Sequence, residues 1–219
     1  MIVIFVNDRS PNSRLANARA AKLPPHAVAD PTQRRILEIA LRMFATHGFH
    51  GTSMRDLAKA LEIAPSALYA SFPSKDHLLA ELVRVGHEAH LAMFRAAVLE
   101  GGAEPVDQLR AVVHANAVMH ATYPHLVVVV NDEMHALPAD LAGPGLALRR
   151  QAVATLMDIL ERGIAKRCFV ARHPVVTVGA IGAMALRIPY WYGPASGLSI
   201  DELAATQAEL ALALVGVAR

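Results

Sequence analysis

The sequence predicts an all-α protein. Its 219 residues are 54% apolar, and many of these are alanines, which favour helices. Runs that alternate β-branched and polar residues are scarce, whereas apolar residues recur at helical spacing between Pro and Gly breaks. The predicted fold is a three-helix N-terminal domain with a helix-turn-helix, followed by a larger C-terminal helical domain.

Capping residues define the first helices. Asp30 is a candidate N-cap with Pro31 at the first helical position, and Gly48 ends that helix. Short helices then begin at Thr52-Ser53 and at Pro65, and Ser74 begins a long helix that reaches about residue 100. Further helices are expected near residues 105–121, 124–136, 145–167, 174–192 and 199–217.

Three regions are predicted. Residues 1–29 form a flexible tail, residues 30–76 the helix-turn-helix domain, and residues 77–219 a domain for ligand binding and dimerisation. The tail is either a disordered segment, or the product of a start codon placed too early, or a basic arm for a DNA backbone or minor groove. Residues 1–85 hold eleven Lys/Arg and seven Asp/Glu, a net charge of +4 that suits contact with a polyanion.

Two short helices joined by a tight turn at Glu62-Ile63 have the layout of a DNA-binding helix-turn-helix. In that layout the second helix lies in the major groove, and its first residues meet base edges. If Glu62 has a positive φ, its side chain costs roughly 1 kcal/mol there.

Residues 32–80 resemble the N-terminal domain of TetR-family regulators. The matching residues run in order from the first helix to the fourth: Ile36, Ala40, Phe44, Gly48-Phe49, Thr52-Ser53-Met54, Leu57-Ala58, Leu68-Tyr69, Phe72, Ser74-Lys75 and Leu78-Leu79. The resemblance implies a DNA-binding repressor that a ligand releases. It implies DNA contacts at Thr52, Ser53, Arg55, Ser66, Ala67, Tyr69, Ser71 and Lys75.

The recognition helix departs from the family pattern. Ser66 and Ala67 replace a common Gly and Thr, and Ser71 replaces a common aromatic residue. Because these side chains are small, we expect modest direct base readout and more dependence on phosphates and DNA shape.

The region from Leu186 to Pro194 and the helix that ends near Phe169 resemble regulators of lipid and sterol catabolism, some of which respond to acyl-CoA thioesters. The resemblance implies a homodimer through the last two helices, which are almost uncharged, and a pseudo-palindromic operator. The predicted effector contacts are Met119, Met134, Met157, Met184, Arg187 and Trp191. Arg187 would pair either with a carboxylate or phosphate of the ligand or with an acid such as Glu133.

Other classes of function find little support. There is no G-x-S-x-G, Walker loop or H-E-x-x-H, so no catalytic residue and no cofactor is expected. The eleven His lack metal-ligand spacing, and no apolar run is long enough to span a membrane. A cytoplasmic location is expected. The alternatives are a helical interaction protein, or an enzyme, that does not bind DNA.

Overall fold

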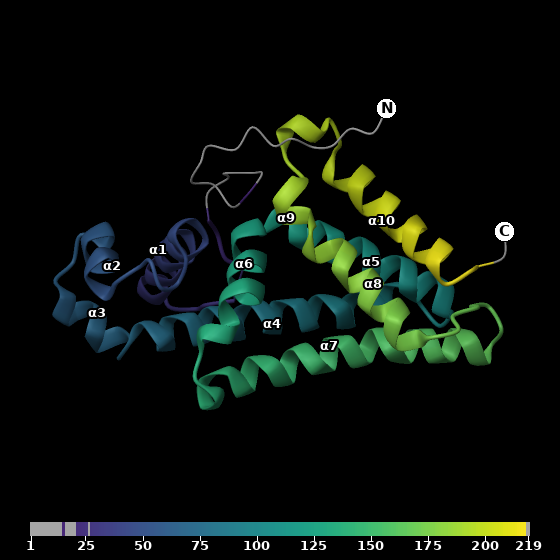
Figure 1. The fold of residues 1–219 in the computed structure, drawn as a ribbon, viewed down its shortest axis with the longest axis horizontal. Coiled ribbons are helices and arrows are strands. Elements are labelled where there is room, and N and C mark those ends of the chain that lie inside the picture. The colour runs from purple at the N-terminus through teal and green to yellow at the C-terminus, as the bar shows by residue number, and fades with distance from the viewer. Residues whose placement is uncertain (1–14, 16–20, 26, 218–219) are drawn as a thin grey trace. The chain divides into compact units, whose positions relative to one another are not determined.

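The structure is a computed structural model that describes residues 15, 21–25 and 27–217, and every regular element in that part is helical (Figure 1). The predicted all-α fold is therefore confirmed. None of the described helices is both long and apolar enough to cross a membrane. The elements, in chain order, are α1 (Pro31–His47), α2 (Met54–Leu61), α3 (Pro65–Ser71), α4 (Lys75–Glu100), α5 (Pro105–Thr122), α6 (Pro124–Val128), the π-helical η1 (Val129–Glu133), the 3₁₀-helical η2 (Met134–Ala136), α7 (Ala139–Ala165), α8 (Pro174–Leu186), α9 (Ile188–Trp191), the 3₁₀-helical η3 (Pro194–Ser196) and α10 (Ile200–Leu214).

The chain forms two compact units. The first contains the described residues up to His87 together with residues 123–146 and 189–193. Its core is built on α1, where Leu37, Leu41 and Phe44 are fully buried and pack with side chains of α2, α3, the start of α4 and α6. The first unit thus contains the helix-turn-helix and the helices that support it.

The second unit contains residues 88–122, 147–188 and 194–217 of the described chain. Helices α5 and α10 pack along each other, and α8 contacts both. Leu109 of α5, Ile159 of α7 and Ala211 of α10 are fully buried in its core.

The boundaries of these two units differ from those of the three predicted regions. Residues 123–146 belong to the first unit because α6 and η1 pack on α1. Part of the predicted tail is also packed: Leu23 is 3% exposed, and its N–H donates to Oε1 of Glu38 at 3.3 Å. Arg34 donates to the carbonyls of Leu23 and Pro24, so this part of the predicted tail is bonded to α1, while the flexibility of residues 1–29 stays a prediction. Residues 1–14, 16–20 and 26 lie outside the described residues.

Three predicted helices differ from those observed. The helix expected at 124–136 is split into α6, η1 and η2. Helix α7 begins at Ala139 and runs through Pro144. The next residue, Gly145, packs closely on α4, where a Cβ would lie 2.4 Å from Cγ1 of Val83. The helix expected at 174–192 breaks at Arg187, since the ring of Pro189 clashes with the preceding helical turn.

The turn between α2 and α3 has a strained backbone at Glu62, the residue for which the sequence left the sign of φ open. Glu62 caps α2 in the left-handed region, with φ 58° and ψ 40°. Replacing Glu62 with Gly should raise the free energy of unfolding by about 0.5–1 kcal/mol, because relief of the Cβ strain exceeds the entropy that Gly adds to the unfolded chain. Urea unfolding measures the change. Glu62→Ala keeps the Cβ and should give no gain, so equal effects of the two variants would contradict the prediction.

Candidate nucleic-acid interface

Helices α2 and α3 form a helix-turn-helix with a buried inner face. Leu57 and Leu68 are 0% exposed and Leu61 is 2% exposed. In the turn, the N–H of Ile63 donates to the carbonyl of Ala58 at 3.1 Å, which closes α2 tightly before α3 begins. The two helices therefore hold each other at a fixed angle and leave the outer face of α3 in solvent.

The outer face of α3 carries four of the eight residues that were predicted to contact DNA. Ser66, Ala67 and Ser71 are exposed, and Tyr69 is 48% exposed despite its large ring. The helix PSALYAS itself has no charged side chain, and its small residues allow close approach of the backbone. Contact of these residues with DNA stays a prediction.

The N-terminus of α2 is fixed by a capping box. The Ser53 hydroxyl accepts the Asp56 N–H at 3.2 Å and donates to Oδ2 of Asp56 at 2.5 Å, and the same carboxylate oxygen accepts the Ser53 N–H at 3.1 Å. Arg55 is exposed beside this box. The Ser53 hydroxyl proton is thus engaged by Asp56 rather than directed at a phosphate.

The hydrogen bonds from the Ser53 side chain and backbone lower the pKa of Asp56 from its ordinary value of 3.8. A lowered carboxyl pKa stabilises the folded state above the unfolded pKa, and this contribution is lost as the pH falls through the folded pKa. Ser53→Ala should lower the free energy of unfolding at pH 7 by about 1 kcal/mol and raise the pKa of Asp56. NMR titration of the Asp56 carboxyl measures the second effect. Ser53→Thr should preserve both, and an unchanged Asp56 titration in Ser53→Ala would contradict the capping box.

Thr52 and Lys75 have structural roles that the sequence did not predict. Thr52 is 2% exposed, and its hydroxyl donates to the Gly48 carbonyl at 3.0 Å. Nζ of Lys75 donates to the carbonyls of Phe49 at 2.7 Å and Thr52 at 2.8 Å, and lies 4.2 Å from the centre of the Phe49 ring. Both side chains thus hold the connection between α1 and α2. We leave Thr52 out of the proposed interface, because its hydroxyl is turned inward, and phosphate binding by Lys75 stays a prediction.

Glu133 is a residue that sequence reasoning did not connect with the helix-turn-helix. It lies at the end of η1, is 7% exposed, and its Oε2 accepts the Phe49 N–H at 3.2 Å. The loop after α1 is therefore held from α4 by Lys75 and from η1 by Glu133. The two partners are 84 positions apart, so no local pattern indicates the contact. The suggested pairing of Glu133 with Arg187 stays a prediction.

The six predicted effector contacts fall into both units. Met134 and Trp191 belong to the first unit, and Met119, Met157, Met184 and Arg187 to the second. Met157 and Met184 pack against the second core, whereas Arg187 is exposed at the C-terminal end of α8. A site that joins the six residues stays a prediction.

Two histidines of the second unit, His90 and His120, are each hydrogen-bonded to Asn116. Nε2 of His90 lies 3.0 Å from Oδ1 of Asn116, and Nδ1 of His120 lies 2.7 Å from the Asn116 carbonyl. Burial lowers the pKa of both rings, that of His120 to about 3. Among the described residues, no three His, Cys, Asp or Glu side chains come together as metal ligands would.

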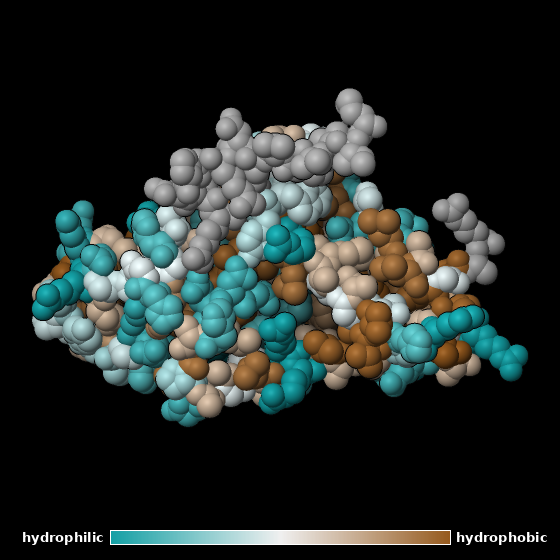
Figure 2. All heavy atoms as spheres, in the orientation of Figure 1, coloured by the Kyte–Doolittle hydropathy of each residue, from teal (hydrophilic) through white to brown (hydrophobic). Residues whose placement is uncertain are grey.

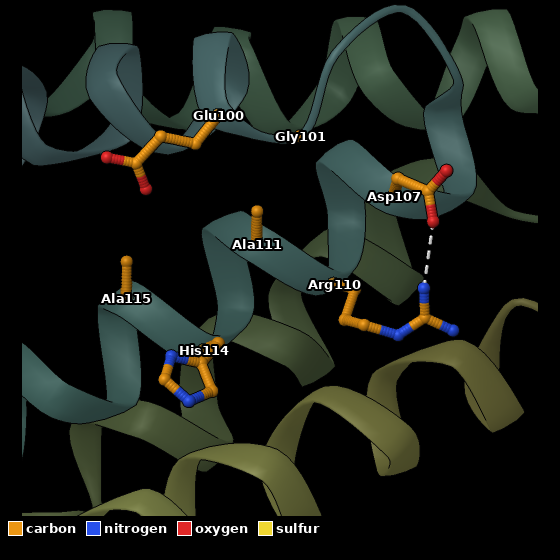
Figure 3. A pocket seen from close by; sticks show the side chains of 7 residues that line it. All are labelled: Glu100, Gly101, Asp107, Arg110, Ala111, His114 and Ala115. Atoms are coloured by element: carbon orange, nitrogen blue, oxygen red, sulfur yellow. Dashed lines mark hydrogen bonds and ion pairs between the residues drawn. The ribbon is translucent and has the colours of Figure 1, made fainter.

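An open hollow of about 640 Å³ lies where α4 ends and α5 begins (Figure 3). Its polar wall contains Glu100, Asp107, Arg110 and His114. Arg110 donates to Asp107 at 2.9 Å and to Glu209 at 3.5 Å, so this cation is already neutralised by carboxylates of the chain. None of the predicted effector contacts lines this hollow.

Comparison with known proteins gives a consistent result. Residues 36–82 match the family model of bacterial regulatory proteins of the tetR family, and residues 102–215 match the tetracyclin repressor-like C-terminal domain. The transcriptional regulator UidR of Escherichia coli K12 is 40% identical over 67 residues, which are 31% of this chain and 34% of UidR, so the match spans about a third of that relative.

Two relatives match over most of the chain. The transcriptional repressor KstR2 of Mycobacterium tuberculosis H37Rv is 26% identical over 189 residues, or 84% of this chain and 92% of KstR2. A regulatory protein of the tetR family from Rhodococcus RHA1 has a crystal structure that covers 87% of this chain and 100% of its own, with a TM-score of 0.82 and 26% identity. The C-terminal family model alone covers more than half of the chain, and the N-terminal model covers the helix-turn-helix. The chain therefore belongs to the TetR family of bacterial regulatory proteins.

Proposed function

We propose that the chain is a transcriptional repressor that binds double-stranded DNA through the outer face of α3 and is released by a small hydrophobic effector, such as an acyl-CoA thioester. The observation that carries the proposal is the exposed face of α3, with Tyr69 48% exposed, on a helix pair whose inner face is fully packed. The similarity to the repressor KstR2 over most of the chain supports it. Such a regulator acts in the cytoplasm and needs neither a cofactor nor catalytic residues.

Binding to DNA from the protein's own upstream region tests the proposal, by fluorescence anisotropy at several salt concentrations. Affinity should fall steeply with salt, because phosphate contacts release counterions. Tyr69→Ala should weaken binding by about tenfold through the loss of one phosphate contact and its packing. Val153→Ala is a matched control, since Val153 of α7 is 47% exposed and lies outside the interface. Weak binding that does not change with salt would contradict the proposal.

A homodimer through α8 and α10 is part of the proposal. Large apolar side chains are exposed on both helices: Val175 is 74%, Val176 69%, Leu210 49% and Leu214 48% exposed. Apolar surface gathers over these two helices in Figure 2. A second copy of the chain would bury this surface, and its two-fold symmetry would match a pseudo-palindromic operator.

Analytical ultracentrifugation tests the dimer. The double variant Val176→Glu/Leu210→Glu should sediment as a monomer and should bind operator DNA at least about 100-fold more weakly, because only one half-site is then held. Val153→Glu provides the control for an added carboxylate at an exposed apolar site on α7. A wild-type monomer would contradict this part of the proposal.

The effector is proposed to contact Met119, Met134, Met157, Met184, Arg187 and Trp191. Methionine side chains adapt to apolar ligands, and Arg187 offers a cation for a carboxylate or phosphate. Thermal shift with acyl-CoA esters, fatty acids and other apolar compounds should identify one stabilising class, and the same class should release DNA. Stabilisation without any loss of DNA affinity would contradict induction, since the ligand would then not discriminate between the two states.

A further inference from the structure

The π-helical turn η1 lies between two distant segments of the first unit. Asp132 accepts a hydrogen bond from the Tyr190 hydroxyl of α9. The next residue, Glu133, accepts the Phe49 N–H of the α1–α2 loop at 3.2 Å. Two adjacent residues of η1, Asp132 and Glu133, thus connect α9 to the α1–α2 loop, which precedes the helix-turn-helix.

These two hydrogen bonds depend on the π-helical register. A π-turn contains one more residue than an α-turn, so its conversion to α-helix would rotate the residues beyond it by about 100°. Asp132 and Glu133 could not then keep both partners. Close packing also favours the observed register: a Cβ on Gly86 of α4 would lie 2.6 Å from Cγ2 of Val130.

The loop depends on Glu133 for part of its geometry. Glu133 binds the Phe49 N–H, and Lys75 binds the Phe49 carbonyl at 2.7 Å, so one peptide segment is held on both of its sides. Loss of one hydrogen-bond donor destabilises a carboxylate that is only 7% exposed, so a displacement of Glu133 is expected to move the Phe49 segment with it.

We propose that η1 is a regulatory coupling within the protomer. The Tyr190–Asp132 hydrogen bond maintains the π register, and Glu133 is the positioning residue that transmits this register to the α1–α2 loop. The proposal rests on the proposed function, because an effector triggers the coupling and DNA binding is what it changes. An effector that displaces the Tyr190 hydroxyl, next to the predicted contact Trp191, frees η1 and loosens the loop that precedes α2 and α3.

Hydrogen exchange of the Phe49 amide tests the coupling directly, in the full chain without DNA or effector. Tyr190→Phe should speed this exchange by about tenfold, with the Leu57 amide of α2 unchanged. Tyr123→Phe is the matched control, because it removes a phenol hydroxyl at the start of α6 in the same unit. Equal Phe49 exchange in Tyr190→Phe and Tyr123→Phe would overturn the proposal.

Variants of Glu133 test whether this residue links the register of η1 to the α1–α2 loop. Glu133→Ala should speed Phe49 exchange by at least about tenfold, whereas Glu133→Gln keeps an acceptor oxygen and should stay within about threefold of wild type. Glu81→Gln controls for the lost charge, since Glu81 pairs with Arg84 on α4 of the same unit. Adding Tyr190→Phe to Glu133→Ala should have no further effect, and additive effects would overturn the coupling.

DNA binding by the same variants separates the coupling from the proposed function. Affinity should fall in Tyr190→Phe and Glu133→Ala and should be kept in Glu133→Gln. A wild-type chain that binds no DNA would refute the proposed function, yet the exchange results would still support or overturn the coupling. If Glu133→Ala fails to fold, the comparison of Tyr190→Phe with Tyr123→Phe decides.

Discussion

Lowering the pH from 7 to 4 should destabilise the protein by about 3–5 kcal/mol, mainly through His120. The ring is buried in the second unit, and the Asn116 carbonyl lies 2.7 Å from its Nδ1. Since a carbonyl only accepts, Nδ1 carries the proton of the neutral ring. Burial, and then the nearby ring of His90, lower the pKa of His120 from 6.5 to about 3. The centres of these two rings are 5.9 Å apart.

The direction of the effect follows from proton binding. Between pH 6.5 and about 3 the unfolded chain protonates this histidine and the folded chain does not. Stability is therefore complete above the unfolded pKa and falls as the pH drops toward the folded pKa. His90 acts in the same direction, because burial lowers its pKa and the positive charge of Arg149 lowers it further.

Urea unfolding at pH 7, 5.5 and 4 measures the effect. His120→Gln should cost stability at pH 7 through imperfect packing, but its stability should depend less on pH than that of the wild type. His114→Gln is the matched control, because His114 lies on the same helix at the open hollow. If His120→Gln and the wild type lose equal stability between pH 7 and 4, His120 is not the cause.

Local signals predicted the helix-turn-helix well. Asp30 accepts the N–H groups of Thr32 and Gln33, Ser53 caps α2, and α3 begins at Pro65. Each boundary depends on a residue and its near neighbours, so it can be read from sequence. The sequence raised a positive φ at Glu62 only as a condition, and the structure has one.

Long-range packing explains what the sequence did not predict. The two clamps on the α1–α2 loop, Lys75 and Glu133, act over 26 and 84 positions. From sequence alone, a lysine after a turn, such as Lys75, is assigned to solvent or to a ligand. Only the folded chain brings its ammonium group to the backbone carbonyls of the α1–α2 loop. Helix α7 also passes through Pro144, where the local signal predicted a break, and Gly145 beside it makes a close contact with the distant Val83.

Gly163→Ala should destabilise the second unit by about 2 kcal/mol. A Cβ on Gly163 would lie 1.9 Å from Cδ2 and 2.2 Å from Cε2 of Phe169. Alanine is about 1 kcal/mol more favourable than glycine inside a helix, but overpacking against a buried ring costs about 3 kcal/mol. Phe169 is 3% exposed and belongs to the second core, so its ring has little room to move.

The backbone around Phe169 also resists adjustment. The Gly163 carbonyl accepts the N–H groups of Cys168 at 2.9 Å and Phe169 at 3.2 Å, and Arg167 makes the turn with φ 60°. The next residue, Val170, donates its N–H to the Val215 carbonyl at 2.6 Å, just beyond the end of α10. A displaced Phe169 would therefore disturb α10, which carries part of the proposed dimer surface, and self-association should weaken together with stability.

Urea unfolding and analytical ultracentrifugation of Gly163→Ala measure the two effects. Gly143→Ala is the control, because a Cβ on Gly143 of α7 meets nothing within 4 Å and α7 lies outside the proposed dimer surface; this variant should be neutral or slightly stabilising. The double variant Gly163→Ala/Phe169→Leu should recover part of the loss, since the smaller side chain vacates the space that the new methyl group needs. A Gly163→Ala protein as stable as Gly143→Ala would show that the contact with Phe169 relaxes without cost, and the expected link between this turn and the dimer surface would then fail with it.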